Sequence, residues 1–298
     1  MGITGLARWI NAPTTGVEQL RRNIILNHQG VVRGKWQLSL GSYRSTMATV
    51  PGVHIPERAL FTTTMGDNVF ALLEDPAAPT RAEVPQEIRE ASPGHASAIP
   101  APSHYRNTLV TVSPPGALEQ LLSQLRARWV PVRQAGQLGS QASSQKAQLI
   151  SQQLTIEGLV CAIGTDWLVR FGHVILAGGA VKGMLVEAEY LPLPVLHCDT
   201  IDGSSELLSN LLASVLPMVP DVKIVAVTVA DSVWDEVLGG PEDEEGVEAD
   251  TLNGDTDDDI YASPDDLPAL RKGDWTGVNR DRRSAFSIVG ALKQEGLL

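Results

Sequence analysis

Potential nucleophiles, general bases and metal ligands are scattered along this 298-residue chain and show no spacing that suits catalysis. The six histidines are His28, His54, His95, His104, His173 and His197. None has metal-ligand spacing with another histidine or a cysteine, apart from His197, which is adjacent to Cys198. Adjacent side chains on a strand point to opposite faces, so these two would not bind one metal ion together. Cys161 and Cys198 form no CxxC pair. The sequence therefore predicts neither a metal site nor a cofactor.

Two short patterns look like fragments of active sites. Ser143 and Lys146 have the spacing of a nucleophile motif but lie in a Gln/Ser-rich loop, so chance is the favoured interpretation. Glu187 and Glu189 would share one face of a strand, where the favoured interpretation is a solvated outer face with Glu187 against Arg170. We expect no enzyme. A hydrolase whose serine, histidine and aspartate converge in a cleft from distant positions remains an open alternative.

The chain carries 23 Lys and Arg against 35 Asp and Glu, a formal charge of −12. Residues 241–266 hold twelve of the acids and no basic residue, so the remainder is balanced. Without a basic field, a main function in nucleic-acid binding is disfavoured. No apolar run approaches the ~18–20 residues of a membrane span, and the N-terminus lacks the features of a signal peptide. We expect a soluble protein of the nucleus or cytoplasm.

Composition separates ordered from flexible segments. Residues 76–104 contain six of the 19 prolines and few large apolar side chains, which favours a flexible insertion. Residues 240–272 include the acidic run, whose charges repel one another, and are predicted to be a second insertion. We expect a single domain over residues 1–298 with these two interruptions.

The remaining sequence alternates between strand-like and helix-like periodicity. Ten β-rich runs cover residues 2–10, 35–48, 57–64, 68–74, 106–113, 128–133, 149–163, 166–177, 181–191 and 223–229. Helix-period runs cover roughly 204–216 and 281–295, and others start at Thr15, in a capping box with Glu18, and at Ser113. The pattern predicts a mainly β (α+β) fold: an antiparallel β-barrel with flanking α-helices.

The segment 166–190 has the strongest hairpin pattern. A two-residue turn at Gly178-Gly179 would pair residues whose numbers sum to 357. That register pairs Trp167 with Tyr190, Val169 with Ala188, Phe171 with Val186 and His173 with Met184, which makes an apolar core face. On the opposite face Arg170 meets Glu187, and we expect an exposed ion pair there.

Arg280, Arg282 and Arg283 stand at the start of the last helix, where cations oppose the helix dipole. Either Asp274 and Asp281 compensate them locally, or an acidic partner or the acidic run does so.

Three blocks resemble the family of subunit 20 of the Mediator complex, in its filamentous-fungal form: FTTTMGDNVFALLED (61–75), the hairpin region 166–194 and the ending 274–298. The resemblance implies a non-catalytic barrel in the nucleus, in the head module of Mediator, the transcription coregulator of RNA polymerase II. It further implies a direct heterodimer with the similarly folded subunit 18, tethered by subunit 8. It implies no catalytic residues, no sequence-specific nucleic-acid binding and no membrane contact.

A subunit contact is predicted in the C-terminal segment, at or near Trp275, Arg283 and Phe286, because Trp and Arg dominate interface hot spots. The alternative is that the last helix closes this chain's own barrel.

A different function also remains open, that of a small-molecule-binding β-barrel with an unknown ligand. It would require an open apolar interior, whereas Trp167, Phe171, Tyr190 and Phe70 are predicted to fill that space.

Overall fold

A computed structural model describes residues 3–46, 56–84, 102–125, 128–132, 153–192, 205–216, 224–227, 229, 233, 236–237 and 277–298. The predicted flexible insertion 240–272 lies outside these residues, as do 85–101 of the other. Residues 76–84 are described; they form turns in which Ala78 and Val84 are buried.

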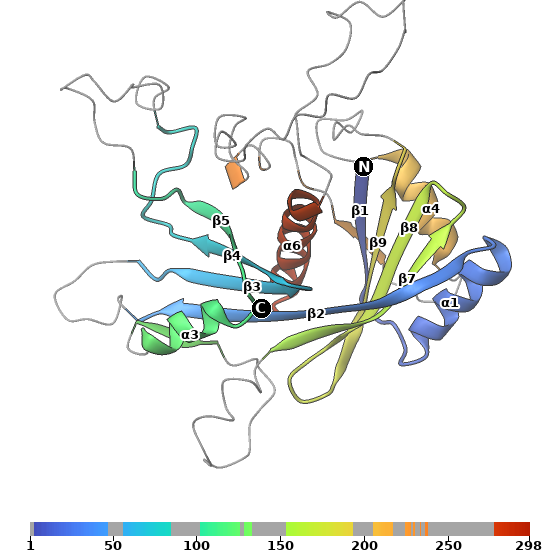
Figure 1. The fold of residues 1–298 in the computed structure, drawn as a ribbon, viewed down its shortest axis with the longest axis horizontal. Helices are drawn as coiled ribbons and strands as arrows, with labels where there is room; N and C mark the ends of the chain where they lie inside the picture. The colour runs from blue at the N-terminus through green and yellow to red at the C-terminus, as the bar shows by residue number, and fades with distance from the viewer. Residues whose placement is uncertain are drawn as a thin grey trace, which may run out of the picture.

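Ten strands form one antiparallel sheet in the order β10-β1-β9-β8-β7-β2-β3-β4-β5, with β6 paired to β2 (Figure 1). The strands are β1 (Ile3–Trp9), β2 (Val31–Ser45), β3 (Ala59–Met65), β4 (Asn68–Glu74), β5 (Asn107–Val112), β6 (Trp129–Pro131), β7 (Leu154–Ile163), β8 (Trp167–Ile175), β9 (Val181–Tyr190) and β10 (Ile224–Val227). Each lies within or overlaps one of the ten predicted runs, so the mainly β class is confirmed.

The sheet curves without closing. β10 and β5 end the strand order, and no ladder between them is present in the described residues. Helix α6 (Gly277–Gln294) runs inside the curve, between β1 and β9 on one side and β3, β4 and β5 on the other (Figure 1). Arg282 of this helix donates a hydrogen bond to the carbonyl of Leu109 in β5, 3.0 Å away. The helix thus occupies the space that the predicted barrel would have enclosed by strand pairing.

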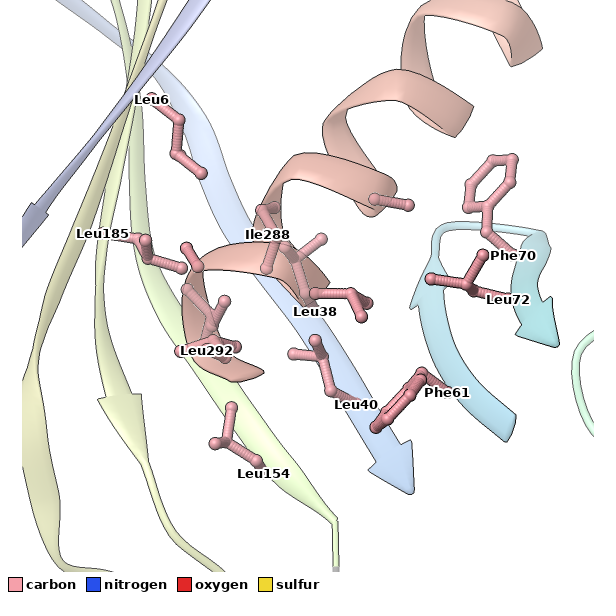
Figure 2. Close-up of a cluster of buried hydrophobic side chains, with 14 of the residues drawn as sticks. Leu6, Leu38, Leu40, Phe61, Phe70, Leu72, Leu154, Leu185, Ile288 and Leu292 are labelled. Carbon is pink, nitrogen blue, oxygen red and sulfur yellow. The ribbon is translucent and has the colours of Figure 1, made fainter. Parts of the chain in front are cut away.

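Helices cover both faces of the sheet, and each face has its own hydrophobic cluster. The inner cluster, around α6, includes Leu38, Leu40, Leu154, Leu185, Ile288 and Leu292. Figure 2 shows Ile288 and Leu292 of the helix among the leucines of the surrounding strands. The outer cluster lies under α1 (Gly16–Asn27) and α4 (Glu206–Val215). It includes Leu20, Ile24, Phe171, Val186, Leu208 and Leu212.

Two predicted helix caps are wrong. The Thr15 side chain makes no capping bond to the backbone of α1. Its hydroxyl oxygen instead accepts a hydrogen bond from the side-chain Nε2 of Gln19, 3.2 Å away. The Thr15 backbone is already in the helical region, with φ −87° and ψ 0°, whereas a capping residue is usually extended.

The helix predicted from Ser113 begins later. It is α3 (Ala117–Gln124), and its N-cap is Gly116 with φ 90°. The hydroxyl of Ser113 donates to the Asp67 carbonyl instead. Trp129 lies beyond this helix in β6, and Leu121 of the helix is 51% exposed.

The β8–β9 hairpin has the predicted register from Trp167↔Tyr190 to His173↔Met184. The turn itself differs. The register shifts after His173, so that Ile175 pairs with Val181. The Gly179 N–H donates to the Leu176 carbonyl at 2.7 Å, and Gly179 alone of the two turn glycines has a positive φ, at 81°. The loop is therefore a bulged turn over Ala177–Gly179 in place of a two-residue turn.

Strands β7 and β8 approach each other closely where Gly158 faces Gly172. A Cβ at Gly158 would lie 1.8 Å from the Phe171 carbonyl oxygen, a backbone atom that cannot rotate away. We expect Gly158→Ala to destabilise the protein by roughly 1–3 kcal/mol, because the strands must separate.

Gly34→Ala is the matched control. Gly34 also lies in the sheet but has open space where its Cβ would be. Urea unfolding of both variants, followed by circular dichroism, measures the difference; equal midpoints for the two variants would contradict the close approach.

Candidate functional site

The face of the hairpin predicted to meet solvent is buried beneath α6. Glu187 is 1% exposed and Glu189 is 5% exposed. They share the inner face with Leu185, which is fully buried in the inner cluster. The apolar Leu185, two positions from Glu187 on the supposedly solvated face, was the signal available in the sequence. The interpretation of this face as solvated is therefore corrected.

Two arginines and one serine surround the two glutamates. Arg170 of β8 contacts Glu187 at 2.9 Å and Glu189 at 2.8 Å. Arg280 of α6 pairs with Glu187 and lies 3.2 Å from Glu189. The Ser284 hydroxyl donates to the second carboxylate oxygen of Glu187. We call these five residues the inner ion cluster; its two positive and two negative charges balance.

The cluster keeps its charges despite burial. Burial acts to raise the pKa of Glu187, but the charges of Arg280 and Arg170 and the hydrogen bond from Ser284 outweigh it and hold that pKa below its ordinary value. Burial acts to lower the pKa of Arg280, and the carboxylates of Glu187 and Glu189 outweigh it in the opposite direction. Both partners are thus ionised at neutral pH.

Arg280 of the last helix therefore pairs with acids within this chain. Asp281 accepts from Arg280 at 2.8 Å, which confirms part of the predicted local compensation. Asp274 lies outside the described residues. The larger compensation comes from Glu187 and Glu189 on β9, which no local pattern in the sequence indicated.

The other end of α6 is anchored to both sides of the sheet. Arg8 of β1 is 1% exposed, pairs with Glu295 at 2.9 Å and donates to the carbonyl of Met184 at 2.7 Å. Lys293 pairs with Glu74, and its ammonium lies 4.7 Å from the centre of the Phe61 ring. Ion pairs at both ends and apolar packing along its length seat α6 firmly in the curve of the sheet.

The three predicted contact residues occupy different environments. Arg283 is 3% exposed within α6. Phe286 is partly buried and packs against the inner cluster. Trp275 lies outside the described residues. The helix packs inside this chain's own curved sheet. Contact of these residues with a partner stays a prediction.

The interior offers little space for a small ligand. Ile288 and Leu292 of α6 are fully buried where the alternative function needed an empty cavity. Phe70 does belong to the inner cluster, whereas Trp167, Phe171 and Tyr190 belong to the outer one. A pocket of about 450 Å³ lies at the rim, lined by residues that include Ile10, Lys182 and Glu295.

A serine, a histidine and an aspartate do converge in the structure. The Ser103 hydroxyl lies 3.0 Å from Nδ1 of His104, and Nε2 of His104 lies 2.7 Å from the carboxylate of Asp75. Sequence analysis did not single out these residues. The same oxygen of Asp75 also accepts from Arg58 at 2.7 Å, so its charge is shared with a permanent cation.

This arrangement is a structural clamp. Asp75 directly follows β4, and its backbone N–H donates to the Arg106 carbonyl just beyond His104. Its carboxylate also accepts from the Ala77 N–H at 3.0 Å. The residues thus join the two ends of the segment between β4 and β5. Ser103 is exposed, and the pocket at the rim is lined by other residues.

The contacts of Asp75 predict that the stability of the protein depends on pH. Burial acts to raise the pKa of Asp75, but the bonds from His104 and Ala77 and the charge of Arg58 hold it below the ordinary value of 3.8. A carboxyl whose pKa is lowered on folding contributes stability above its unfolded pKa and loses it as the pH falls through the folded value. We expect Asp75→Asn to cost roughly 1–3 kcal/mol near neutral pH and progressively less below pH 3.8. Urea unfolding across that range checks this; a constant difference would contradict it.

Two further features of the described residues bear on function. None of their helices is long and apolar enough to cross a bilayer. They contain no group of three or more histidine, cysteine, aspartate or glutamate side chains placed to hold a metal ion.

One family model matches most of the chain. It is described as the TATA-binding related factor (TRF) of subunit 20 of Mediator complex, and it matches residues 1–240. No curated protein matches the chain.

Among solved structures, the PH1819 protein from Pyrococcus horikoshii OT3 is 10% identical, with 75% of this chain and 92% of that chain covered and a TM-score of 0.34. The inorganic triphosphatase NE1496 is also 10% identical, with 80% and 94% covered and a TM-score of 0.26. Scores this low carry no argument about function.

Proposed function

The chain belongs to the family of subunit 20 of the Mediator complex, and from that membership we propose that it is a non-catalytic structural subunit of the Mediator head module. The family establishes a Mediator subunit that acts in the regulation of transcription. The observation that carries the proposal is the match over residues 1–240, which spans all ten strands of the sheet. A nuclear location follows from this function.

The proposed action is assembly. The chain forms a direct heterodimer with subunit 18, tethered by subunit 8, and reaches RNA polymerase II indirectly through the rest of the complex. The α6 helix that fills the interior supports a scaffold role, because it leaves the sheet's inner face occupied by the chain itself. The charge balance outside the acidic run also supports protein partners over nucleic acid.

The contact of Trp275, Arg283 and Phe286 with a partner is part of this proposal. Because Arg283 is buried, its share is to hold α6 in place, while the partly buried Phe286 is offered to the partner together with Trp275, which lies outside the described residues. Trp and other aromatic side chains are frequent anchors of protein interfaces.

Co-expression of the full chain with tagged subunit 18 and subunit 8 tests the proposal. We expect one complex in equal amounts by size-exclusion chromatography and mass spectrometry. The outcome that would overturn it is elution of a folded chain free of both partners.

The contact residues are tested by Phe286→Ala in the same assay, with Leu121→Ala on α3 as control, since Leu121 is 51% exposed and lies on a different helix. Weaker co-purification for Phe286→Ala alone, with an unchanged melting temperature of the isolated chain, supports the contact. Unchanged assembly with a lower melting temperature assigns Phe286 to this chain's own core.

A further inference from the structure

The first half of β2 has an unpaired edge. Residues 31–40 pair with β7, but on the other side β3 begins its pairing at Leu38. Within the described part of the chain, residues 31–37 therefore carry backbone N–H and C=O groups on one side with no neighbouring strand. In Figure 1, β2 extends past the end of β3 toward α1.

This edge is open to solvent as well as unpaired. All five residues from Val31 to Lys35 are exposed, with Val31 at 55% and Val32 at 38%. A Cβ at Gly34 would meet no atom within 4 Å. The edge of β5, by contrast, is partly covered, because its Leu109 carbonyl accepts from Arg282 of α6. Exposed strand edges with apolar side chains are places where a further strand adds.

The charge beside the edge has one dominant sign. Arg33 and Lys35 lie on the open segment, and Arg22 is exposed on the preceding helix. No acidic residue occurs between Glu18 and Glu57. On the neighbouring strand β7, Glu157 is exposed and lies opposite Gln37. An added strand that carries carboxylates would meet Arg33 and Lys35 as opposite-charge pairs.

We propose that residues 31–37 of β2 accept an extended acidic segment of another protein, added to the sheet as a strand. The unpaired backbone edge selects an extended segment, and Arg33 and Lys35 select acidic side chains. This surface goes beyond the assembly proposed above and does not depend on it.

A second copy of this chain does not fit the same edge. Antiparallel self-pairing about Gly34 would place Arg33 opposite Lys35, which sets like charges directly against each other. The charges that deter self-association are the ones that attract an acidic strand.

The test uses the full chain and a fluorescein-labelled synthetic peptide in which valine and glutamate alternate. Two comparison peptides carry lysine in place of glutamate, or proline at the central valine. Fluorescence anisotropy measures binding, and hydrogen exchange measures the protection of amides in residues 31–37. We expect the acidic peptide to bind and to protect these amides, and we expect both comparison peptides to bind at least roughly tenfold more weakly.

The matched variants carry the same change in charge at two places. Arg33→Glu with Lys35→Glu alters the open edge. Arg44→Glu with Lys182→Glu is the control, since Arg44 lies on the same strand where both sides are paired and Lys182 is exposed on β9. We expect roughly tenfold weaker binding of the acidic peptide for the first pair alone.

Melting curves establish that both variants are folded. Absence of binding by the acidic peptide, equal binding of the proline peptide, equal weakening by the control variant, or protection confined to other strands would each overturn the proposal.

Discussion

Replacing Glu187 with alanine is expected to lower the free energy of unfolding by about 3–5 kcal/mol. The carboxylate is 1% exposed and is the point where Arg170, Arg280 and Ser284 meet. Its removal leaves two buried guanidinium groups with one remaining shared acid, Glu189. Breaking a buried pair on one side costs far more than an exposed pair is worth, because the remaining charge has lost its water as well as its partner.

Chemical denaturation measures this effect, with Glu157→Ala as the matched control. Glu157 is a strand glutamate of the same sheet, but it is exposed, and its substitution is expected to change stability by no more than about 0.5 kcal/mol. Equal losses for the two variants would show that the inner ion cluster adds nothing to stability.

An experiment that exchanges the charges of Arg170 and Glu187 distinguishes the inner ion cluster from a simple ion pair. In an isolated exposed pair, Arg170→Glu with Glu187→Arg would restore most of the loss of about 1 kcal/mol that Arg170→Glu causes. Here Arg280 stands against the same carboxylate, so an arginine at position 187 would face a second arginine. We expect no recovery in the double variant; recovery to wild-type stability would mean that α6 does not contact Glu187.

Replacing Phe171 with alanine is expected to cost about 3–5 kcal/mol, through lost burial and the cavity left behind. Phe171 is fully buried on the other face of β8, opposite Val186 and under the outer helices. The control is Leu26→Ala on α1, because Leu26 is 64% exposed and its truncation opens no cavity. Thermal unfolding of the two variants measures the difference, and a loss for Phe171→Ala below about 1 kcal/mol would contradict a packed outer cluster.

Local patterns in the sequence were sufficient to predict the strands and the pairing of residues within the β8–β9 hairpin. Trp167, Val169 and Phe171 lie at every second position, and the register that pairs them with Tyr190, Ala188 and Val186 keeps the apolar side chains together, although the turn itself differs from the predicted one. The ten strands follow for the same reason, since side-chain alternation and turn residues act over short stretches. The place of the last helix along the sequence likewise follows from the spacing of Ala285, Ile288 and Leu292.

Contacts between distant segments required the tertiary structure. Arg280 and Glu187 stand 93 positions apart, so no periodicity relates them, and the face holding Glu187 carries the same residues whether water or a helix covers it. The clamp at Asp75 depends on His104, which returns after a long intervening segment. The unpaired edge of β2 likewise arises because β3 begins its pairing only at Leu38. Alternation specifies which side chains share a face, but which face a distant element covers depends on where the whole sheet bends and on which charges it can bury in pairs.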